Sequence, residues 1–290
     1  MADPRRKSGV FVQRLTRWKL GARTAKWIDD GRVPGASGYS SARWSAIEHA
    51  LTAVPPRGYG YHDAGLDERV VEFPWALHRL KSRWTPGTPI LDAGSVLNHP
   101  RILAHCRREG LGPLSIVTLR YEGRADVSDD VRYEFADLRQ LPYRDEWFSS
   151  VVCLSTIEHV GMDNCIYGDT TGASSTPALE TMRAMGELRR VTRAGGVLLL
   201  SVPFGRRDNR GWFRIMDGDD IEQLTHAPGW RLDRLQIVRA TREGWRECTM
   251  AEAATAGYNE SGNAKHEGVR TAPDWVSAAE AVALVELTAA

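Results

Sequence analysis

The chain has 290 residues, enough for one large domain or two small ones, and its 38 basic and 37 acidic residues leave a net charge of +1. This balance argues against a dedicated nucleic-acid binder, and a hydrophobic fraction of 42% is ordinary for a globular chain. No run of 18 apolar residues predicts a membrane-spanning helix, and the N-terminus lacks the apolar segment of a secretory signal. We therefore expect a cytoplasmic protein without integral membrane contact. The four scattered cysteines have neither disulfide-framework nor zinc-site spacing, so we expect reduced thiols and no bound metal.

The first 26 residues are strongly basic and carry apolar residues at helical spacing, which predicts an amphipathic helix. Its apolar positions are Phe11, Leu15, Trp18, Ala22 and Ala25. Such a helix either packs as a cap on the main domain or contacts an anionic substrate or membrane surface. Two further helical patterns cover residues 44–53 and 70–84, and Pro86-Gly87 ends the second. We therefore expect residues 1–84 to form an N-terminal helical cap.

From residue 89 onward, short apolar runs alternate with helical stretches, a pattern typical of β-α-β units and a largely parallel sheet. Seven strands are predicted, at residues 90–93, 114–119, 131–135, 150–155, 196–202, 232–239 and 281–287. The helix between the fourth and fifth strands is expected to begin with Thr176 as its cap and Pro177 at its first position. Gly195-Gly196 is expected to end it. The sequence thus predicts an α/β domain over residues 85–290.

The first predicted strand ends in the small-residue corner Asp92-Ala93-Gly94-Ser95. In an open parallel sheet, ligands bind beyond the carboxyl ends of the strands, and a glycine there lets the backbone approach a ligand without a Cβ between them. Many strand-to-helix turns contain glycine for purely structural reasons, so this corner alone leaves both interpretations open.

Four sequence blocks give the corner a context. They are Leu91–Ser95, Asp137–Phe148, Val151–Val160 and Glu187–Pro203. In their order and spacing they resemble the class I S-adenosylmethionine-dependent methyltransferases, over about 200 residues. The resemblance implies a seven-stranded, mostly parallel Rossmann-like sheet with helices on both faces, S-adenosylmethionine as cofactor, and methyl transfer as the reaction.

The resemblance also implies which residues contact the cofactor. Asp92 would hold its ammonium, directly or through water, and Asp137 would accept a hydrogen bond from the exocyclic amine of adenine. The remaining contacts would come from small or backbone groups at the strand ends, namely Gly94, Ser95, Leu138, Leu154 and Ser155.

Two positions depart from the family pattern. Val96 and Asn98 stand where the family's loop usually has glycines, and because β-branched Val96 resists a left-handed backbone, we expect the loop to turn differently. The family usually has an acid at the end of the second strand that binds the ribose hydroxyls. This acid is absent here: Arg120 lies near its position, and Glu122 is the predicted substitute. These departures keep open a degenerate member that serves as a partner-binding scaffold.

A nicotinamide-dependent dehydrogenase would use the same kind of corner. Its fingerprint requires glycines two and five residues after the first, where this chain has Val96 and His99. The Leu-Pro turn at 141–142 and the Glu-His block at 158–159 also have no role in a dehydrogenase, so the spacing argues against it.

On the substrate side, His159 is the candidate general base, because it follows the fourth strand and has a suitable ordinary pKa. The substrate candidates, chosen from a polar loop and an arginine-rich aromatic cluster, are Tyr167, Arg207, Trp212 and Arg214. We expect a small-molecule acceptor, such as a saccharide or specialised metabolite, rather than a nucleic acid. A macromolecular acceptor would predict salt-sensitive binding to a polyanion, and the oligomeric state is left open.

Overall fold

The computed structural model of the chain describes residues 39–53, 65–120, 130–165, 172–258 and 279–290. The basic helix predicted within residues 1–26 lies outside these ranges. The helices are α3 (Tyr39–Thr52), α4 (Arg69–Arg83), α5 (Pro100–Glu109), a 3₁₀ turn (Ile157–His159), α6 (Pro177–Val191), α7 (Gly218–Thr225) and α8 (Met250–Ala253). The strands are β1 (Ile90–Ala93), β2 (Leu114–Thr118), β3 (Val131–Phe135), β4 (Phe148–Leu154), β5 (Thr192–Pro203), β6 (Asp208–Asn209), β7 (Arg214–Ile215), β8 (Trp230–Thr241), β9 (Gly244–Cys248) and β10 (Ala281–Ala289).

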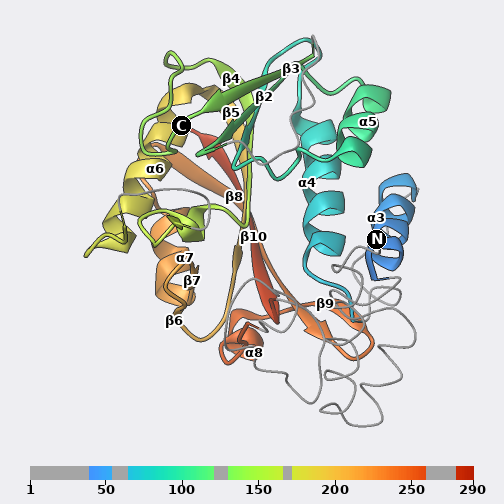
Figure 1. Cartoon of the computed structure of the whole chain (residues 1–290), viewed down its shortest axis with the longest axis vertical. Coiled ribbons are helices and arrows are strands. Elements are labelled where there is room, and N and C mark those ends of the chain that lie inside the picture. The colour runs from blue at the N-terminus through green and yellow to red at the C-terminus, as the bar shows by residue number, and fades with distance from the viewer. Residues whose placement is uncertain (1–38, 54–64, 121–129, 166–171, 259–278) are drawn as a thin grey trace, which may run out of the picture.

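The main sheet of the described part has eight strands in the order β3-β2-β1-β4-β5-β10-β8-β9 (Figure 1). The first five run parallel, β10 is antiparallel to both of its neighbours, and β9 is antiparallel to β8. The mostly parallel α/β fold expected from the sequence is confirmed, and each of the seven predicted strands is present.

The main sheet has one strand more than the seven predicted, β9, and the small two-stranded sheet of β6 and β7 was not anticipated either. Thr241 pairs with Gly244 across a tight hairpin whose two central residues are Arg242 and Glu243. Two-residue hairpin turns are usually recognised by Asn-Gly or a similar pair, and Arg242-Glu243 is not such a pair, so the sequence did not predict this turn.

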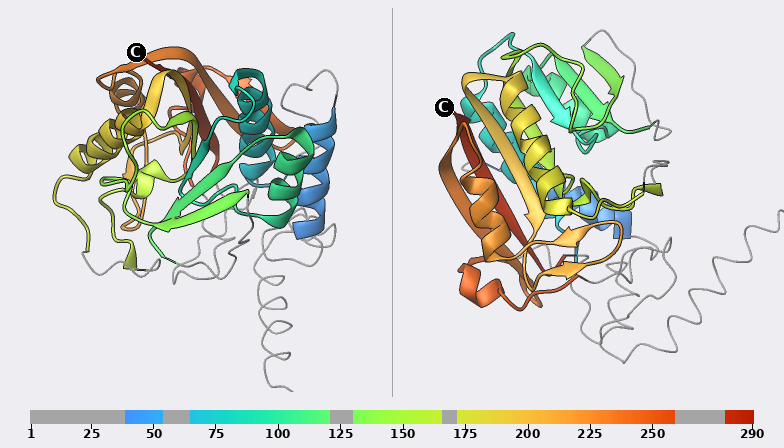
Figure 2. Two further views of the ribbon diagram at one scale, coloured as in Figure 1. Left: turned by 90° about the horizontal axis from the view of Figure 1, so that it is seen from above. Right: turned by 90° about the vertical axis from the view of Figure 1, so that its left-hand side faces the viewer.

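Helices cover both faces of the sheet. Figures 1 and 2 show α3, α4 and α5 on one side and α6 and α7 on the other. Successive strand residues point to opposite faces, so Val151 joins the core under α6 while Val152 joins the core under α4 and α5. Strands buried on both faces read as continuous apolar runs, which is why β4 and β5 were recognisable from the sequence.

The helix α6 begins at Pro177 as the sequence predicts, but its cap contact and its end differ from the prediction. Thr176 occupies the cap position, but its side chain makes no capping hydrogen bond; Ser174 Oγ accepts one from the Thr176 amide instead, at 3.1 Å. The helix ends at Val191, and Gly195-Gly196 lies within β5. There the pairing with β4 shifts register, and a Cβ on Gly196 would lie 2.9 Å from the Ser149 carbonyl oxygen. This glycine therefore serves close strand packing rather than helix termination.

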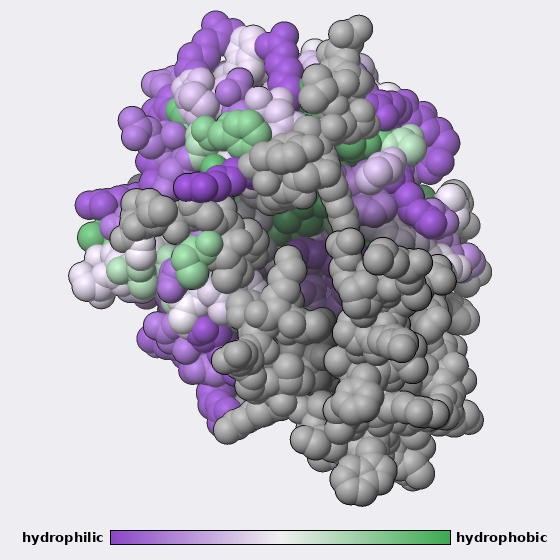
Figure 3. Space-filling view, in the orientation of Figure 1, coloured by the Kyte–Doolittle hydropathy of each residue, from purple (hydrophilic) through white to green (hydrophobic). Residues whose placement is uncertain are grey.

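The described part of the face in Figure 3 is largely hydrophilic, with apolar residues in small separate areas. Three large apolar side chains are exposed among the described residues, Phe135, Leu179 and Leu232. Within the same ranges, no helix is both long and apolar enough to cross a bilayer.

Candidate cofactor-binding site

A cavity of about 310 Å³ lies at the carboxyl ends of β1, β2, β3 and β4. Its walls come from α4, the loop after β1, the end of β2, and the segments that follow β3 and β4. The chain leaves β1 for β2 on one side and reaches β4 on the other, so the cavity adjoins the point where the strand order reverses. This is where open α/β sheets bind ligands, and the volume is in the range of small-molecule pockets.

The loop after β1 is shaped by Asp92. Its carboxylate is fully buried and accepts hydrogen bonds from the backbone amides of Val96, at 3.2 Å, and Leu97, at 2.8 Å. The left-handed residues are Gly94 (φ 123°) and Ser95 (φ 62°). The expectation that the loop turns elsewhere than at Val96 is confirmed.

Gly94 is required by its neighbour as well as by its backbone angle. A Cβ at this position would lie 2.2 Å from Thr156 Oγ1, a distance that no real Cβ tolerates. Ser95 and Asn98 form a polar group with the hydroxyl of Tyr133 on β3, in which Ser95 Oγ lies 3.1 Å from that hydroxyl and Asn98 Nδ2 donates to both. Side chains thus brace a loop that lacks the family's later glycines.

The end of β4 is held by a buried carboxylate from α4. Glu72 is fully buried, and its Oε1 accepts hydrogen bonds from the hydroxyls of Ser155 and Ser201, each at 2.6 Å, while its other oxygen pairs with Arg69. Ser155 adopts a left-handed backbone (φ 39°) and donates its amide to the carbonyl and hydroxyl oxygens of Ser201. This network fixes the backbone that forms the floor of the cavity.

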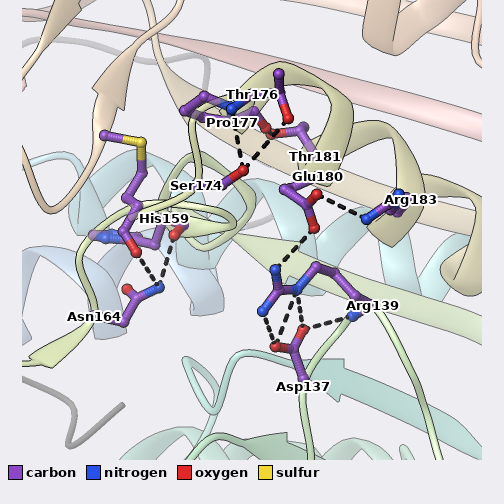
Figure 4. Close-up of polar contacts among 11 residues, drawn as sticks. Asp137, Arg139, His159, Asn164, Ser174, Thr176, Pro177, Glu180, Thr181 and Arg183 are labelled. Atoms are coloured by element: carbon purple, nitrogen blue, oxygen red, sulfur yellow. Dashed lines mark hydrogen bonds and ion pairs between the residues drawn. The ribbon is translucent and has the colours of Figure 1, made fainter. Parts of the chain in front are cut away.

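An ion-pair chain lies at the β3 side of the cavity (Figure 4). Arg139 donates to both carboxylate oxygens of Asp137 and, through Nη1, to Glu180 Oε2 at 2.8 Å. Arg183 donates to the other oxygen of Glu180 at 2.8 Å. Burial alone would raise the pKa of Asp137, but the hydrogen bonds from Arg139 outweigh it and hold that pKa below its usual value, so the carboxylate is ionised at neutral pH.

His159 lines the cavity with a defined tautomer. Its Nδ1 lies 2.8 Å from the carbonyl oxygen of Trp212, and because a carbonyl only accepts, Nδ1 carries the hydrogen and Nε2 the lone pair. Burial lowers the pKa of His159 to about 4, so the ring is neutral at pH 7. The neighbouring carboxyl of Glu158 is buried, and burial raises its pKa well above the ordinary value.

The structure brings six of the predicted site residues together around the cavity, namely Gly94, Ser95, Asp137, Leu138, Ser155 and His159. Asp92 and Leu154 are fully buried and do not line it. The predicted contact between Asp92 and the cofactor's ammonium stays a prediction. Glu122 and Tyr167 lie outside the described residues.

The remaining substrate candidates do not line the cavity. Arg207 forms ion pairs with Asp217 and Asp220, and Arg214 is held by Thr181 and Asp220. Trp212 packs beside His159, with ring centroids 5.0 Å apart. The arginine-rich stretch that suggested an anion site is thus tied to acids on and before α7, whose partnership is not visible in the sequence order.

Sequence reasoning missed twelve of the residues that line the cavity, among them Arg69, Phe73, Thr118 and Arg139. The first two lie on α4, which the sequence assigned to the cap. Arg139 stands inside a recognised block, and its charge beside Asp137 was the available signal.

Comparisons with known proteins agree with this geometry. Residues 114–200, which run from β2 into β5, match the family described as a methyltransferase domain. No curated protein matches the chain.

Solved structures resemble the fold at low identity. The [4+2]-cyclase SpnF is 17% identical, with 86% of this chain and 92% of that one covered and a TM-score of 0.49. Burkholderia thailandensis 1,6-didemethyltoxoflavin-N1-methyltransferase, solved with 1,6-didemethyltoxoflavin and S-adenosylhomocysteine, is 12% identical, with 100% and 91% covered and a TM-score of 0.42. The YcgJ protein of Bacillus subtilis is 11% identical, with 74% and 97% covered and a TM-score of 0.45. At these values the likenesses carry no argument about activity.

The matched segment 114–200 contains β2, β3, β4 and most of β5. Strand β1 precedes this segment in the chain but lies between β2 and β4 in the sheet, and the loop that follows it brings Gly94 to the cavity. The chain thus carries, over residues 114–200, a segment similar to the methyltransferase-domain family, as the resemblance in the sequence predicts.

Proposed function

We propose that the chain binds S-adenosylmethionine in the cavity beyond β1 and β4 and transfers its methyl group to a small molecule. The observation that carries this proposal is the convergence of Gly94, Ser155 and Asp137 on one cavity of about 310 Å³. They come from three separate segments of the chain, and each is a residue that the family resemblance assigned to the cofactor.

The groups on the cavity wall fit the cofactor. The ionised carboxylate of Asp137 suits the amino group of adenine, with Leu138 beside it as an apolar surface. At the other end, Gly94 and Ser155 bring backbone within reach of the methionine portion. Thr118 and Leu119, at the end of β2, line the part of the cavity where the ribose would lie.

S-adenosylmethionine supplies an electrophilic methyl group on a sulfonium. The chain's contribution is to align the acceptor with that methyl group and to exclude water. His159, neutral and with its lone pair on Nε2, would take the proton that an O–H or N–H acceptor loses. Because its pKa is only about 4, His159 is a weak base, which favours proton transfer late in the displacement or an acceptor that needs little assistance.

A small-molecule acceptor is favoured over a polyanion by the charges near the site. The net charge is only +1, and the two arginines of the 207–214 stretch that were expected to face substrate are paired with acids. We keep a saccharide or specialised metabolite as the proposed class. A cytoplasmic location is also proposed, since all four cysteines lie in the described ranges and none forms a disulfide.

Calorimetry on dialysed protein tests the proposal, with S-adenosylmethionine, S-adenosylhomocysteine and NAD as ligands. We expect both adenosyl compounds to bind and NAD to bind at least 10-fold more weakly. A Gly94→Ala variant, whose Cβ would collide with Thr156, should lose most of this affinity, which assigns binding to the cavity.

The opposite results are equally informative. NAD binding more tightly than S-adenosylhomocysteine would point to a dehydrogenase. If neither adenosyl compound bound, the protein would be better explained as a partner-binding scaffold, the alternative that the altered loop suggested, than as a methyltransferase.

A further inference from the structure

Asn164, in the loop that follows β4, has a buried polar atom without a partner. The residue lines the cavity and is only 7% exposed. Its Nδ2 donates to the carbonyl oxygens of His159, at 2.9 Å, and Met162, at 3.2 Å (Figure 4). Because a carbonyl oxygen only accepts, these two contacts fix the orientation of the amide and turn Oδ1 away from them. Among the described residues, no group donates a hydrogen bond to this Oδ1.

The loop that carries Asn164 is held by hydrogen bonds to two other segments. The amide of Ser174 donates to the Gly161 carbonyl oxygen at 2.8 Å, and the amide of Asp163 donates to the Gly211 carbonyl oxygen at 3.0 Å. Rearranging the loop to give Oδ1 a partner would break these contacts. A buried acceptor without a donor costs free energy, and in a small-molecule site such fixed polar groups orient the ligand.

The proposed base lies on the same loop. His159 lines the cavity as well, and its backbone is joined to the Asn164 side chain by the hydrogen bond to Nδ2. One short loop thus carries two acceptors, Nε2 of His159 and Oδ1 of Asn164. We propose that Asn164 is a specificity-determining residue whose Oδ1 binds a hydroxyl group of the methyl acceptor, next to the hydroxyl group that is methylated. This inference rests on the proposed function and names the substrate class, a molecule with two neighbouring hydroxyl groups, as in a saccharide.

The charges near the loop favour a hydroxyl donor over an ammonium. Arg69 lines the same cavity, and the sulfonium of the cofactor would add a second positive charge. Burial lowers the pKa of His159, and the charge of Arg69 adds to this lowering, so that charge is felt at the loop. Both positive charges would repel a cationic amine, whereas a hydroxyl group supplies a donor without charge.

The second hydroxyl group is held while the first one reacts. The oxygen of the reacting hydroxyl forms a bond to the methyl carbon, the bond between that carbon and the sulfonium sulfur breaks, and S-adenosylhomocysteine leaves. The hydroxyl proton goes to Nε2 of His159, as in the proposed function. The hydrogen bond to Asn164 Oδ1 limits the rotation of the acceptor and so aligns the reacting oxygen with the methyl group.

The test uses two matched pairs of probes, catechol with phenol and trans-cyclohexane-1,2-diol with cyclohexanol. The members of each pair differ by one hydroxyl group. The readout is kcat/KM for methyl transfer, followed as formation of S-adenosylhomocysteine from S-adenosylmethionine. For the wild-type protein we expect the diol to exceed its mono-alcohol by at least about 10-fold in at least one pair, because the mono-alcohol leaves Oδ1 without a donor. Asn164→Leu, which removes Oδ1, should reduce this ratio to below about 3-fold.

Two further variants separate binding of the acceptor from support of the loop. Asn164→Asp keeps an oxygen acceptor but loses the donor to the two carbonyl oxygens, so it should slow transfer to both members of a pair and keep a ratio of at least about 5-fold. Asp163→Ala is the matched control from the same loop. Asp163 accepts from the amide of Cys165 at 3.0 Å and does not line the cavity, so its removal should affect both probes alike and keep the wild-type ratio.

The diol-to-mono-alcohol ratio decides the inference, because a general loosening of the loop would weaken transfer to both probes. A wild-type ratio near one in both pairs would overturn it, and so would a lack of transfer to either diol by a protein that binds S-adenosylhomocysteine. An Asn164→Leu protein that keeps the wild-type ratio would also overturn it. If that variant does not fold, Asn164→Ser, whose hydroxyl can still donate to one carbonyl oxygen, takes its place. If the wild-type protein does not bind S-adenosylhomocysteine at all, the proposed function fails too, whereas binding without a preference for the diol removes only this inference.

Discussion

His159 is a single group whose burial should be visible in the stability of the whole chain. Its pKa is lowered to about 4, below the value of about 6.5 expected when the chain is unfolded. Between pH 6.5 and 4 the unfolded state therefore binds more protons than the folded state, and stability falls as the pH falls through that window. This lowering of the pKa of His159 corresponds to roughly 3 kcal/mol of stability, present in full above about pH 6.5 and lost by about pH 4.

The measurement is urea unfolding of the wild-type protein and of His159→Asn at pH 7.5, 6 and 5. Asparagine keeps a donor for the Trp212 carbonyl but does not titrate. We expect the stability of the wild-type protein relative to the variant to fall as the pH is lowered. Glu68, whose pKa is raised to about 7 by burial and nearby acids, acts with the opposite sign, and it cancels in the comparison because both proteins contain it. A difference that stayed constant with pH would show that His159 is not buried in its neutral form.

For single residues, the sequence predicts which side chains restrict the backbone, but it says little about contacts between residues that are far apart in the chain. The β-branched Val96 already ruled out a left-handed turn there, and Gly94 with Ser95 supplies it instead. No sequence pattern places Glu72 under Ser155, because 83 residues separate them and a carboxylate inside an apolar helix face contradicts the periodicity. The pairing of Arg207 with Asp217 likewise exists only once β7 and α7 have folded back.

Among the elements, α4 does more than cover the sheet. It was predicted from its apolar stripe, and Phe73, Leu77 and Leu80 are buried as expected. Its acid Glu72 is fully buried and binds Arg69 on the same helix, Ser155 directly after β4 and Ser201 on β5, and so joins the helix to the ends of these two strands. Removing one partner of a buried ion pair typically costs about 3 kcal/mol or more, because the other charge is left uncompensated.

Glu72→Leu should therefore destabilise the protein by about 3 kcal/mol in urea unfolding. Glu72→Gln should cost less, since an amide oxygen can still accept from Ser155 and Ser201. Glu243→Gln on the exposed β8–β9 turn, where the side chain is 71% exposed, is the control and should change stability by less than about 0.5 kcal/mol. Equal effects of the leucine and glutamine substitutions would show that the hydroxyl contacts contribute nothing.

Element ends were harder to predict than element existence. Each predicted strand is present, because runs buried on both faces of a parallel sheet are continuously apolar. The predicted end of α6 was wrong because a Gly-Gly pair suits a helix end and a strand bulge equally well in sequence. Only the register shift between β4 and β5 distinguishes them.

For the whole molecule, we predict that residues 1–84 do not form a cap separable from residues 85–290. The described part of that region contributes to the core on one face of the sheet, where Trp44, Ile47 and Leu77 pack with Ile102 and Val152. Removing it would expose that face and delete Arg69, Glu72 and Phe73 from the site. A sheet with one uncovered apolar face does not form a stable layer structure.

We therefore expect a chain covering residues 39–290 to unfold cooperatively and to bind S-adenosylhomocysteine, because it keeps all of the described residues that line the cavity. A chain covering residues 85–290 should show no cooperative thermal transition by circular dichroism and no binding by calorimetry. The two chains differ by residues 39–84, which contain α3, α4 and the segment between them, so the comparison tests this helical layer and leaves the sheet intact. Cooperative unfolding of the shorter chain, with ligand affinity retained, would mean that the sheet and its remaining helices are sufficient and that the first 84 residues form a separable cap.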